Sequence, residues 1–545
     1  MNREEELIKQ GNKLFEKRSS LMSLWQEIGD NFYPQRADFL KIHDLGDEFA
    51  AHLMTSYPVL AHRDLADSFT GMLRPRSKKW FSTSVIDDER LSNGAKRWLE
   101  YASNVQFRAM YDRAAMFTRA TKEGDHDYAA FGQTVISVEP SRDLTNLLYR
   151  CWHLRDCAWC ENEEGIIDTI HRKWKPTARQ MNTLFKGKVH HEIKSCLEKD
   201  PYREFEVRHI VIPADMYEGE KKYNTPFVSI FIDVENKFIM EETPRRRFGY
   251  VIPRWQTVSG SQYAYSPSTI VALSDARLIQ AMTLTLLEAG EKAANPPMIA
   301  AKESVRSDIA LYAGGITWID AQHDGRLSDG LMPLNQDYRA MPYGLEMRND
   351  VREMISECFY LNKLTLPPQG DMTAFEVSQR IQEYIRQAMP IFEPMEHEYN
   401  GALCEETFKI LMDFNAFGPV EDIPIELLDH EIEFKFESPL HEAIEKEKGQ
   451  KFLEASELLA AAAQIDPDSA VNFDAITAFR DALSGIGVPS KWITSEVEAA
   501  QAIAQNAMMR QIQQGAMMAQ GGAEVAKSTA EASQAVSEAE RVQSY

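Results

Sequence analysis

The stretch Pro267–Ala294 constrains the fold of this chain most, because it predicts one long helix with an almost uncharged middle. Only Asp275 and Arg277 carry charge between Ser268 and Leu287. A long helix with so few charges must be covered on most of its sides.

The boundaries of this helix are marked on both sides. Tyr265-Ser266-Pro267 predicts its start, and Asn295-Pro296-Pro297 predicts its end. A turn-rich insert follows, and a second helical run then extends from Gly344 to Tyr360. Another copy of the same chain can supply the cover that this helix pair needs. The pair therefore decides between the core of an ordinary enzyme and a subunit of a ring.

Composition is that of a large globular protein. The chain has 545 residues, 44% hydrophobic and 26% charged, enough for roughly two to four domains. Mean hydropathy is −0.40. We expect no membrane span, since the apolar runs contain charges or hydroxyls. The N-terminus lacks the layout of a signal peptide, so we expect synthesis in a cytoplasm.

The net charge of −23 excludes a protein that coats duplex DNA, because that binding mode needs a basic face. If the chain handles DNA, it must do so without gripping it. Enzymatic function is not favoured either. The sequence has no P-loop, no H-E-x-x-H, no G-x-S-x-G and no G-x-G-x-x-G after a strand. We therefore expect no catalytic residue and no cofactor.

Six cysteines are expected to be reduced in a chain without a secretion signal. Cys157 and Cys160 form a lone C-x-x-C with His190, His191 and Cys196 downstream, which is one pattern that zinc uses. The downstream residues lack the paired spacing of a second ligand set. The alternative, that these cysteines are small hydrophobic residues of strand-like segments, is favoured.

Local patterns predict a mainly helical chain with an α+β layer in the middle. Helices are expected over residues 4–34, 53–73, 91–120, 177–184, 190–197, 395–414, 439–463 and 473–483. Strands are expected over 133–138, 147–152, 166–174, 205–212, 228–234, 298–301, 315–319 and 432–436. The loop Leu361–Met372 holds two prolines and a glycine, and Thr373–Glu376 reads as a capping box.

Two clusters of basic residues stand out from the acidic background. The first is Arg74, Arg76, Lys78 and Lys79, and the second is Arg245, Arg246 and Arg247. Each cluster can contact phosphate, or it can form ion pairs with the acidic excess within the chain or between subunits. The sequence leaves these alternatives open.

Five motifs in order resemble the portal, or head-to-tail connector, proteins of short-tailed bacteriophages. They are Trp25–Ile28 with Tyr33-Pro34, Leu65–Leu73 with Lys79-Trp80-Phe81, Arg254-Trp255 with Tyr263–Pro267, Thr373–Val377 with Arg380 and Glu383, and Ser438-Pro439-Leu440 with Ala443. The resemblance covers residues from about 7 to 495. Ala264 stands where the family often has glycine.

The resemblance implies a mainly α ring subunit with an α+β wing. Its regions would be a wing (1–266 and 373–437), two stem helices (267–294 and 343–360), a clip (295–342), a tunnel loop (361–372) and a crown (438–495). Residues 496–545, rich in alanine and glutamine, would extend the crown or be partly disordered.

The resemblance also implies a ring, typically of twelve copies, at one capsid vertex of the virion. DNA would pass through its channel during packaging and ejection. Partners would be the terminase large subunit, the tail adaptor, the major capsid and scaffolding proteins, and internal ejection proteins. A ring of twelve copies would carry roughly −276 before counterions, so an acidic wall would repel phosphate and let DNA slide.

Candidate residues follow from these regions. The channel or tunnel loop would use Lys363, Thr365, Gln369, Arg277 and Gln280, with Ser274 on the same stripe. The clip would dock its partners through Asp320, Gln322, His323, Asp324 and Arg326. The alternative function is another virion structural protein, an internal core or adaptor ring, without a DNA channel.

Overall fold

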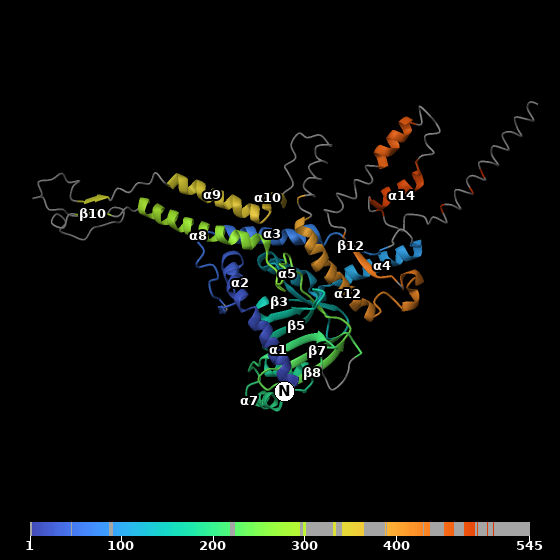
Figure 1. Cartoon of the computed structure of the whole chain (residues 1–545), viewed down its shortest axis with the longest axis horizontal. Helices are drawn as coiled ribbons and strands as arrows, with labels where there is room; N and C mark the ends of the chain where they lie inside the picture. The colour runs from blue at the N-terminus through green and yellow to red at the C-terminus, as the bar shows by residue number, and fades with distance from the viewer. Residues whose placement is uncertain are drawn as a thin grey trace, which may run out of the picture. The chain divides into compact units, whose positions relative to one another are not determined.

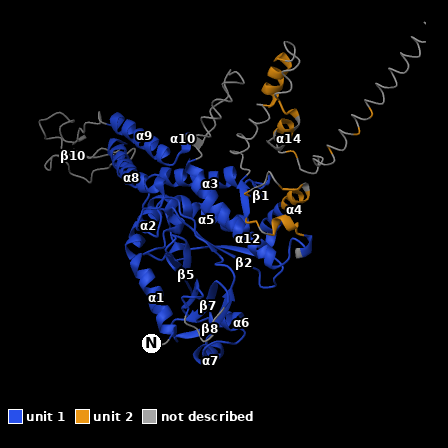
Figure 2. Ribbon diagram, turned by 45° about the vertical axis from the view of Figure 1, so that its right-hand side comes forward, with its two compact units in different colours: residues 1–85, 101–422, 432–444 blue, residues 86–100, 423–431, 445–545 orange. Residues whose placement is uncertain are grey.

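The computed structural model describes residues 3–436, except 45, 87–90, 218–223, 295–297, 301–330, 334–340, 365–386, 388–389 and 429. Beyond residue 436 it describes 452–462, 473–485 and the single positions 488, 499, 505 and 509. Two compact units are present (Figure 2). Unit 1 comprises residues 1–85, 101–422 and 432–444, and unit 2 comprises residues 86–100, 423–431 and 445–545.

The N-terminal region of unit 1 is helical, as predicted, but each predicted helix differs at its ends. The run 4–34 is two helices, α1 (Arg3–Lys17) and α2 (Ser19–Phe32). They break at Arg18, whose buried guanidinium donates to the carbonyls of Leu154 and Arg155. Helix α3 (Tyr57–Leu73) starts later than predicted because Pro58 occupies its first turn.

The predicted run 91–120 also divides. Helix α4 (Asn93–Met110) belongs to both units, and α5 (Phe117–Phe131) follows it. A short turn of helix, η3 (Arg113–Ala115), separates them, and Met116 takes a left-handed conformation with φ 58°. Other single turns are η1 (Pro34–Arg36), η4 (Leu154–Asp156) and η7 (Val420–Asp422).

The centre of unit 1 is an antiparallel five-stranded sheet. Its strands follow the order β4 (Cys157–Glu161), β5 (Ile167–Trp174), β6 (Val207–Pro213), β7 (Phe227–Asp233) and β8 (Phe238–Arg245). The sequence did not predict β8, because this edge strand carries the charges and the proline that protect an edge from further pairing.

Helices cover both faces of this sheet. Leu7 of α1 packs against Ile210, Ile212 and Ile230 on one face. On the other face lie α6 (Ala178–Leu184) and α7 (His191–Lys199), which bury Met181 and Ile193. The alternation along β6 produces this arrangement, since successive residues of a strand point to opposite faces.

Two smaller sheets complete the predicted α+β layer. One has the order β3 (Leu147–Trp152), β2 (Val135–Pro140) and β9 (Tyr250–Val251). The other pairs β1 (Phe81–Val85), which was not predicted, with β12 (Ile432–Phe436), which was. The predicted helix 395–414 starts as a π-turn, η6 (Met395–Gly401), and continues as α12 (Ala402–Asp413).

The long helix is α8 (Pro267–Ala294), with the bounds that the sequence predicts. It leads to the strand pair β10 (Met298–Ala300) and β11 (Leu331–Pro333). The chain returns beside α8 as α9 (Met341–Cys358), so the two helices form an antiparallel hairpin (Figure 1). Helix α9 starts three residues before the predicted Gly344, inside the predicted insert.

The predicted loop 361–372 is wrong at its start, because its first four residues form α10 (Leu361–Leu364). The rest of that loop, the capping box at Thr373–Glu376 and the predicted strand 315–319 lie outside the described residues.

Unit 2 contains a small aromatic cluster. Residues 452–462 are helical and α14 spans Ala475–Gly485. The ring of Phe452 lies 6.4 Å from that of Phe473 and 5.7 Å from that of Phe479. The unit also contains the turn η8 (Ile425–Leu427). Most of the predicted helix 439–463 and of the tail 496–545 lies outside the described residues.

Candidate functional site

The α8–α9 hairpin is only partly covered by the core of unit 1. The buried face of α8 is narrow and rich in small residues, comprising Ser268, Thr269, Ala272, Leu273, Ala276, Ile279 and Thr283. Gly344 of α9 allows a close approach, since a Cβ built there would lie 2.9 Å from Cδ2 of Leu286. The two helices therefore pack tightly against each other.

The opposite face of α8 is exposed and carries the apolar residues Ile270, Val271 and Leu278 beside Ser274 and Arg277. Leu284 and Leu287, nearer the end of the helix, are exposed as well. Only 28% of the most apolar window of α8 is buried in the single chain. By length and composition alone α8 could cross a membrane, which is weak evidence for a single helix. The single chain therefore leaves apolar side chains of α8 without the cover that a long, weakly charged helix needs.

The base of α8 is fixed to the end of α5 by hydroxyl groups. The last carbonyls of a helix have no partner within the helix. Here Ser266 Oγ donates to the carbonyl of Ala129 at 2.7 Å, and Thr269 Oγ1 donates to that of Ala130 at 2.7 Å. Both hydroxyls are buried. These hydroxyl groups thus provide hydrogen-bond donors for the last carbonyls of α5. They also set the direction in which α8 leaves the sheet region.

Gly132 makes this junction possible. It ends α5 in a left-handed conformation with φ 72°, and its N–H donates to the carbonyl of Tyr128. A Cβ built there would lie 2.1 Å from the carbonyl carbon of Tyr265 and 2.3 Å from the nitrogen of Ser266. The backbone before α8 therefore passes directly over Gly132, and no other residue fits there.

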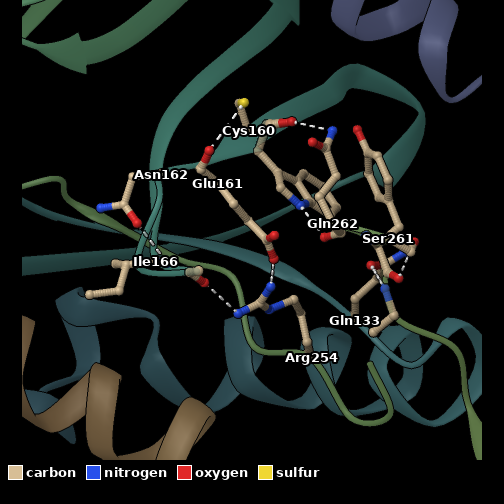
Figure 3. A network of polar contacts seen from close by, with 12 residues as sticks. Gln133, Cys160, Glu161, Asn162, Ile166, Arg254, Ser261 and Gln262 are labelled. Carbon is tan, nitrogen blue, oxygen red and sulfur yellow. Dashed lines mark hydrogen bonds and ion pairs between the residues drawn. The ribbon is translucent and has the colours of Figure 1, made fainter. Parts of the chain in front are cut away.

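A polar network holds the segment that leads into α8 (Figure 3). Arg254 forms an ion pair with Glu161 at the end of β4, and its guanidinium also donates to the carbonyl of Gly165 at 3.1 Å. The Arg254 backbone N–H donates to Glu398 at 2.9 Å. Of these residues, the sequence analysis singled out only Arg254, as part of a motif. Its acidic partners lie 93 and 144 residues away along the chain, so the local sequence could not reveal them.

Two amides complete this network. Gln262 Nε2 donates to the carbonyl of Trp159 at 2.8 Å, and Trp159 Nε1 donates to the carbonyl of Gln262 at 3.2 Å. Gln133 Oε1 accepts the N–H of Ala264 at 2.9 Å (Figure 3). These contacts hold residues 254–264, the segment that leads into α8.

The arrangement is a rigid base from which a long, partly uncovered helical hairpin projects. A family model described as bacteriophage head to tail connecting protein matches residues 4–493. The chain belongs to this family.

Two curated portal proteins are similar along most of their length. The probable portal protein of Bordetella phage BPP-1 is 25% identical over 530 residues, which cover 94% of this chain and 93% of that protein. The portal protein of Salmonella phage epsilon15 is 21% identical over 434 residues, covering 77% and 76%. The chain is therefore a structural component of the portal at the capsid vertex, as its sequence motifs implied.

Among solved structures, a chain from the neck of an empty GTA particle, computed with C6 symmetry, matches 72% of this chain and 84% of its own length. Sequence identity is 9% and the TM-score is 0.33. This likeness adds nothing to the family assignment.

The two predicted channel residues of α8 contact residues 27, 54 and 55 of the same chain. Gln280 Oε1 accepts the N–H groups of Met54 and Thr55 at 2.7 and 2.9 Å, and Gln280 Nε2 donates to the carbonyl of Thr55 at 2.9 Å. These hydrogen bonds use three of the four donor and acceptor positions of its amide. A contact of Gln280 with DNA stays a prediction. Arg277 is paired with Glu27 of α2 at 2.5 Å and is half exposed.

Replacing Gln280 by alanine should loosen the 53–55 segment. Loss of its three hydrogen bonds should speed amide hydrogen exchange at Met54 and Thr55 by about tenfold. Exchange measured by mass spectrometry tests this. Ser274→Ala is the control, because Ser274 Oγ only donates to the carbonyl of Val271 within α8. Equal exchange in both variants would contradict a clamping role for Gln280.

Arg74 of the first basic cluster is buried, so it cannot contact phosphate at the surface. Its Nη2 forms an ion pair with Asp125, and its Nη1 donates to Asn400 Oδ1 at 2.7 Å. Thr70 Oγ1 donates to the second oxygen of Asp125 at 2.7 Å. The alternative of an ion pair within the chain therefore holds for Arg74. Arg76 and Lys78 are exposed, and Lys79 is half-buried.

The second basic cluster also pairs within the portal chain. Arg245 lies 3.0 Å from Glu139, and Arg247 lies 3.0 Å from Asp413. Arg246 is 3.8 Å from the same Asp413, but its side chain is 80% exposed, so it is the member best placed for an external contact.

The side chains of the remaining predicted site residues are not among those that the structure describes. Lys363 lies in α10, but its side chain is not described, and Thr365 and Gln369 are outside the described residues. The same holds for Asp320, Gln322, His323, Asp324 and Arg326 of the predicted clip.

The cysteines of the described chain are free thiols. Cys157 is buried, and burial raises the pKa of its thiol to about 12. Burial likewise raises the pKa of Cys151, which donates to Asp127 at 3.6 Å. Within the described ranges, no group of three or more His, Cys, Asp or Glu is placed to hold a metal ion. A protonated, buried Cys157 packs as a small hydrophobic residue.

Proposed function

We propose that copies of this chain close into a ring through the α8–α9 hairpin, with a central channel for double-stranded DNA. The expected ring has twelve copies. In this proposal the wing is 1–266 with 373–437, the stem is 267–294 with 343–360, the clip is 295–342 and the crown is 438–495.

The exposed apolar face of α8 carries the proposal. Helix α8 has 28 residues, so it is about 42 Å long at 1.5 Å per residue. Leu278, near its centre, is 45% exposed, and Val271, two turns earlier, is 59% exposed. Burying such side chains stabilises an assembly by about 25 cal/mol per Å² of apolar area. Neighbouring helix pairs around an axis would supply that cover.

The charge of the chain supports passage of DNA rather than binding. With 83 acidic and 60 basic residues, a ring wall would repel the phosphates of the duplex. We propose that Lys363, Thr365 and Gln369 of residues 361–372 offer weak, repeated contacts to DNA. Arg277 could join them only by leaving Glu27.

The clip residues 295–342 would dock other components of the virion vertex. Asp320, Gln322, His323, Asp324 and Arg326 would contact the terminase large subunit during packaging and the tail adaptor afterwards. The wing and crown would contact the major capsid, scaffolding and internal ejection proteins, and the chain would be made in the host cytoplasm.

Replacing Leu278 by glutamate should prevent ring formation, because it places a charge in the contact that covers α8. We expect the protein concentration at half-assembly to rise by at least about a hundredfold, because the glutamate charge would be buried without a partner. Mass photometry and negative-stain images of the purified chain measure this directly.

Leu184→Glu is the matched control, since Leu184 is 41% exposed on α6 and lies outside the stem. Rings of wild-type number from Leu278→Glu would contradict the α8 contact. Wild-type protein that forms only fibres or monomers would contradict the ring itself and favour another virion structural role.

A further inference from the structure

A cavity of about 380 Å³ lies between the end of α3 and the start of α5. Gly71, Arg74 and Arg76 line it on the α3 side, and Tyr111, Phe117 and Thr118 line it on the α5 side. Arg74 and Phe117 are buried, whereas Gly71, Arg76 and Thr118 are exposed. The cavity is therefore open to the surface, with aromatic walls and cations at its base and rim.

Positive charge in the cavity is incompletely neutralised. The Arg74 side chain is only 1% exposed, and its Nη atoms bind Asp125 and Asn400. Its Nε is buried and has no hydrogen-bond partner among the described residues. Arg76 forms no ion pair with a described carboxylate. Burial raises the pKa of Tyr111, and the nearby positive charge of Arg76 opposes this rise.

The start of α5 also favours a negatively charged group in the cavity. Met116 precedes α5 and provides no side-chain cap. The first N–H groups of this 15-residue helix therefore lack helical partners next to Phe117 and Thr118. The helix dipole places partial positive charge at the same end.

We propose that this cavity receives a carboxylate side chain, with its apolar stem, from a neighbouring copy of the chain. The inference rests on the ring proposed above. In a closed ring each subunit presents one surface to the neighbour on one side and a different surface to the neighbour on the other. A chain of net charge −23 presents acidic groups to such a cationic recess, and charge complementarity fixes the register of the contact.

A DNA phosphate fits the cavity less well. Binding of duplex DNA depends on several phosphates neutralised across a basic face. Only Arg76 among the exposed lining residues is cationic. Aromatic walls instead suit the methylene groups of a glutamate or aspartate, whose charge would end at the exposed Arg76.

Two variants test the contact in the full-length chain. Arg76→Glu reverses the rim charge. Gly71→Leu fills the recess, because a Cβ at Gly71 has no heavy atom within 4 Å, and leucine suits a helix better than glycine. We expect each to raise the half-assembly concentration by about tenfold or more, as expected for losing a charge-assisted contact. Thermal unfolding at fixed protein concentration should show the subunit fold retained.

Arg113→Glu is the matched control, because Arg113 is exposed on η3 and does not line the cavity. It should assemble as the wild type does. A third variant, Arg76→Lys, identifies the occupant. A zero-length carbodiimide should couple position 76 to an aspartate or glutamate of another subunit, which mass spectrometry of the cross-linked peptide would show.

The outcomes separate the two proposals. Wild-type rings with unchanged assembly of Arg76→Glu and Gly71→Leu would overturn the cavity contact and leave the ring intact. Absence of wild-type rings at every concentration would overturn the ring and with it this contact. Unchanged assembly of Arg76→Glu, together with lost binding of a short DNA duplex, would overturn the carboxylate in favour of phosphate.

Discussion

Replacing Gly132 by alanine should destabilise unit 1 by about 4 kcal/mol, because two separate costs add. The left-handed conformation, φ 72°, costs roughly 1 kcal/mol for a residue with a Cβ. The larger cost is steric. The Cβ would lie 2.1 Å from the Tyr265 carbonyl carbon and 2.3 Å from the Ser266 nitrogen, and backbone cannot rotate away as a side chain can.

The variant should therefore be poorly soluble or unfold at lower denaturant. Urea unfolding at a fixed protein concentration measures the loss. Gly165→Ala is the control, since Gly165 has a similar φ of 78° but no heavy atom within 4 Å of an added Cβ. It should cost about 1 kcal/mol. Equal losses in the two variants would show that the contact between Gly132 and the start of α8 is not tight.

Replacing Arg74 by methionine should cost about 3–5 kcal/mol, because it leaves the Asp125 carboxylate buried without its ion-pair partner. Asp125 is fully buried, and Thr70 and Arg74 are its partners in the structure. Arg74 also holds Asn400 in η6, directly before α12. The same substitution therefore detaches α3 from both α5 and the chain before α12.

Denaturant unfolding of Arg74→Met measures this loss. Arg63→Met is the control, because the Arg63–Asp64 pair at 3.1 Å is about half exposed, and such pairs contribute about 0–1 kcal/mol. The double variant Arg74→Met with Asp125→Leu should recover part of the loss, since it removes the unpaired charge. An effect of Arg74→Met no larger than that of Arg63→Met would contradict the role of the buried pair.

Local sequence signals predicted the helices and strands whose ends or alternation depend on neighbouring residues. The bounds of α8 follow from Pro267 and from Asn295-Pro296-Pro297, and Thr177 caps α6 in a capping box with Gln180. Strands β3 and β12 follow from alternation and composition. Strands β1 and β8 were missed because their pattern resembles that of a loop until a partner strand pairs with them.

The roles of individual polar side chains could not be predicted in this way. Gln280 is predicted to line a channel, and within the single chain it binds the backbone at Met54 and Thr55, 226 and 225 residues away. For Arg74 the sequence left open a contact with phosphate or an ion pair, and the structure buries it beside Asp125. Sequence shows that a residue is polar, but its partner depends on which distant segments meet.

The sequence by itself determined that a long helix with an almost uncharged middle exists, where it starts and ends, and that it needs cover. Periodicity and end signals act within one helix, so they can be read locally. The tertiary structure decided which face is covered. One face of α8 is fixed to the rest of unit 1 by the hydroxyls of Ser266 and Thr269, the close contact at Gly132 and the hydrogen bonds of Gln280. Packing against the chain's own core leaves the opposite, apolar face exposed, because that core reaches only one side of the helix.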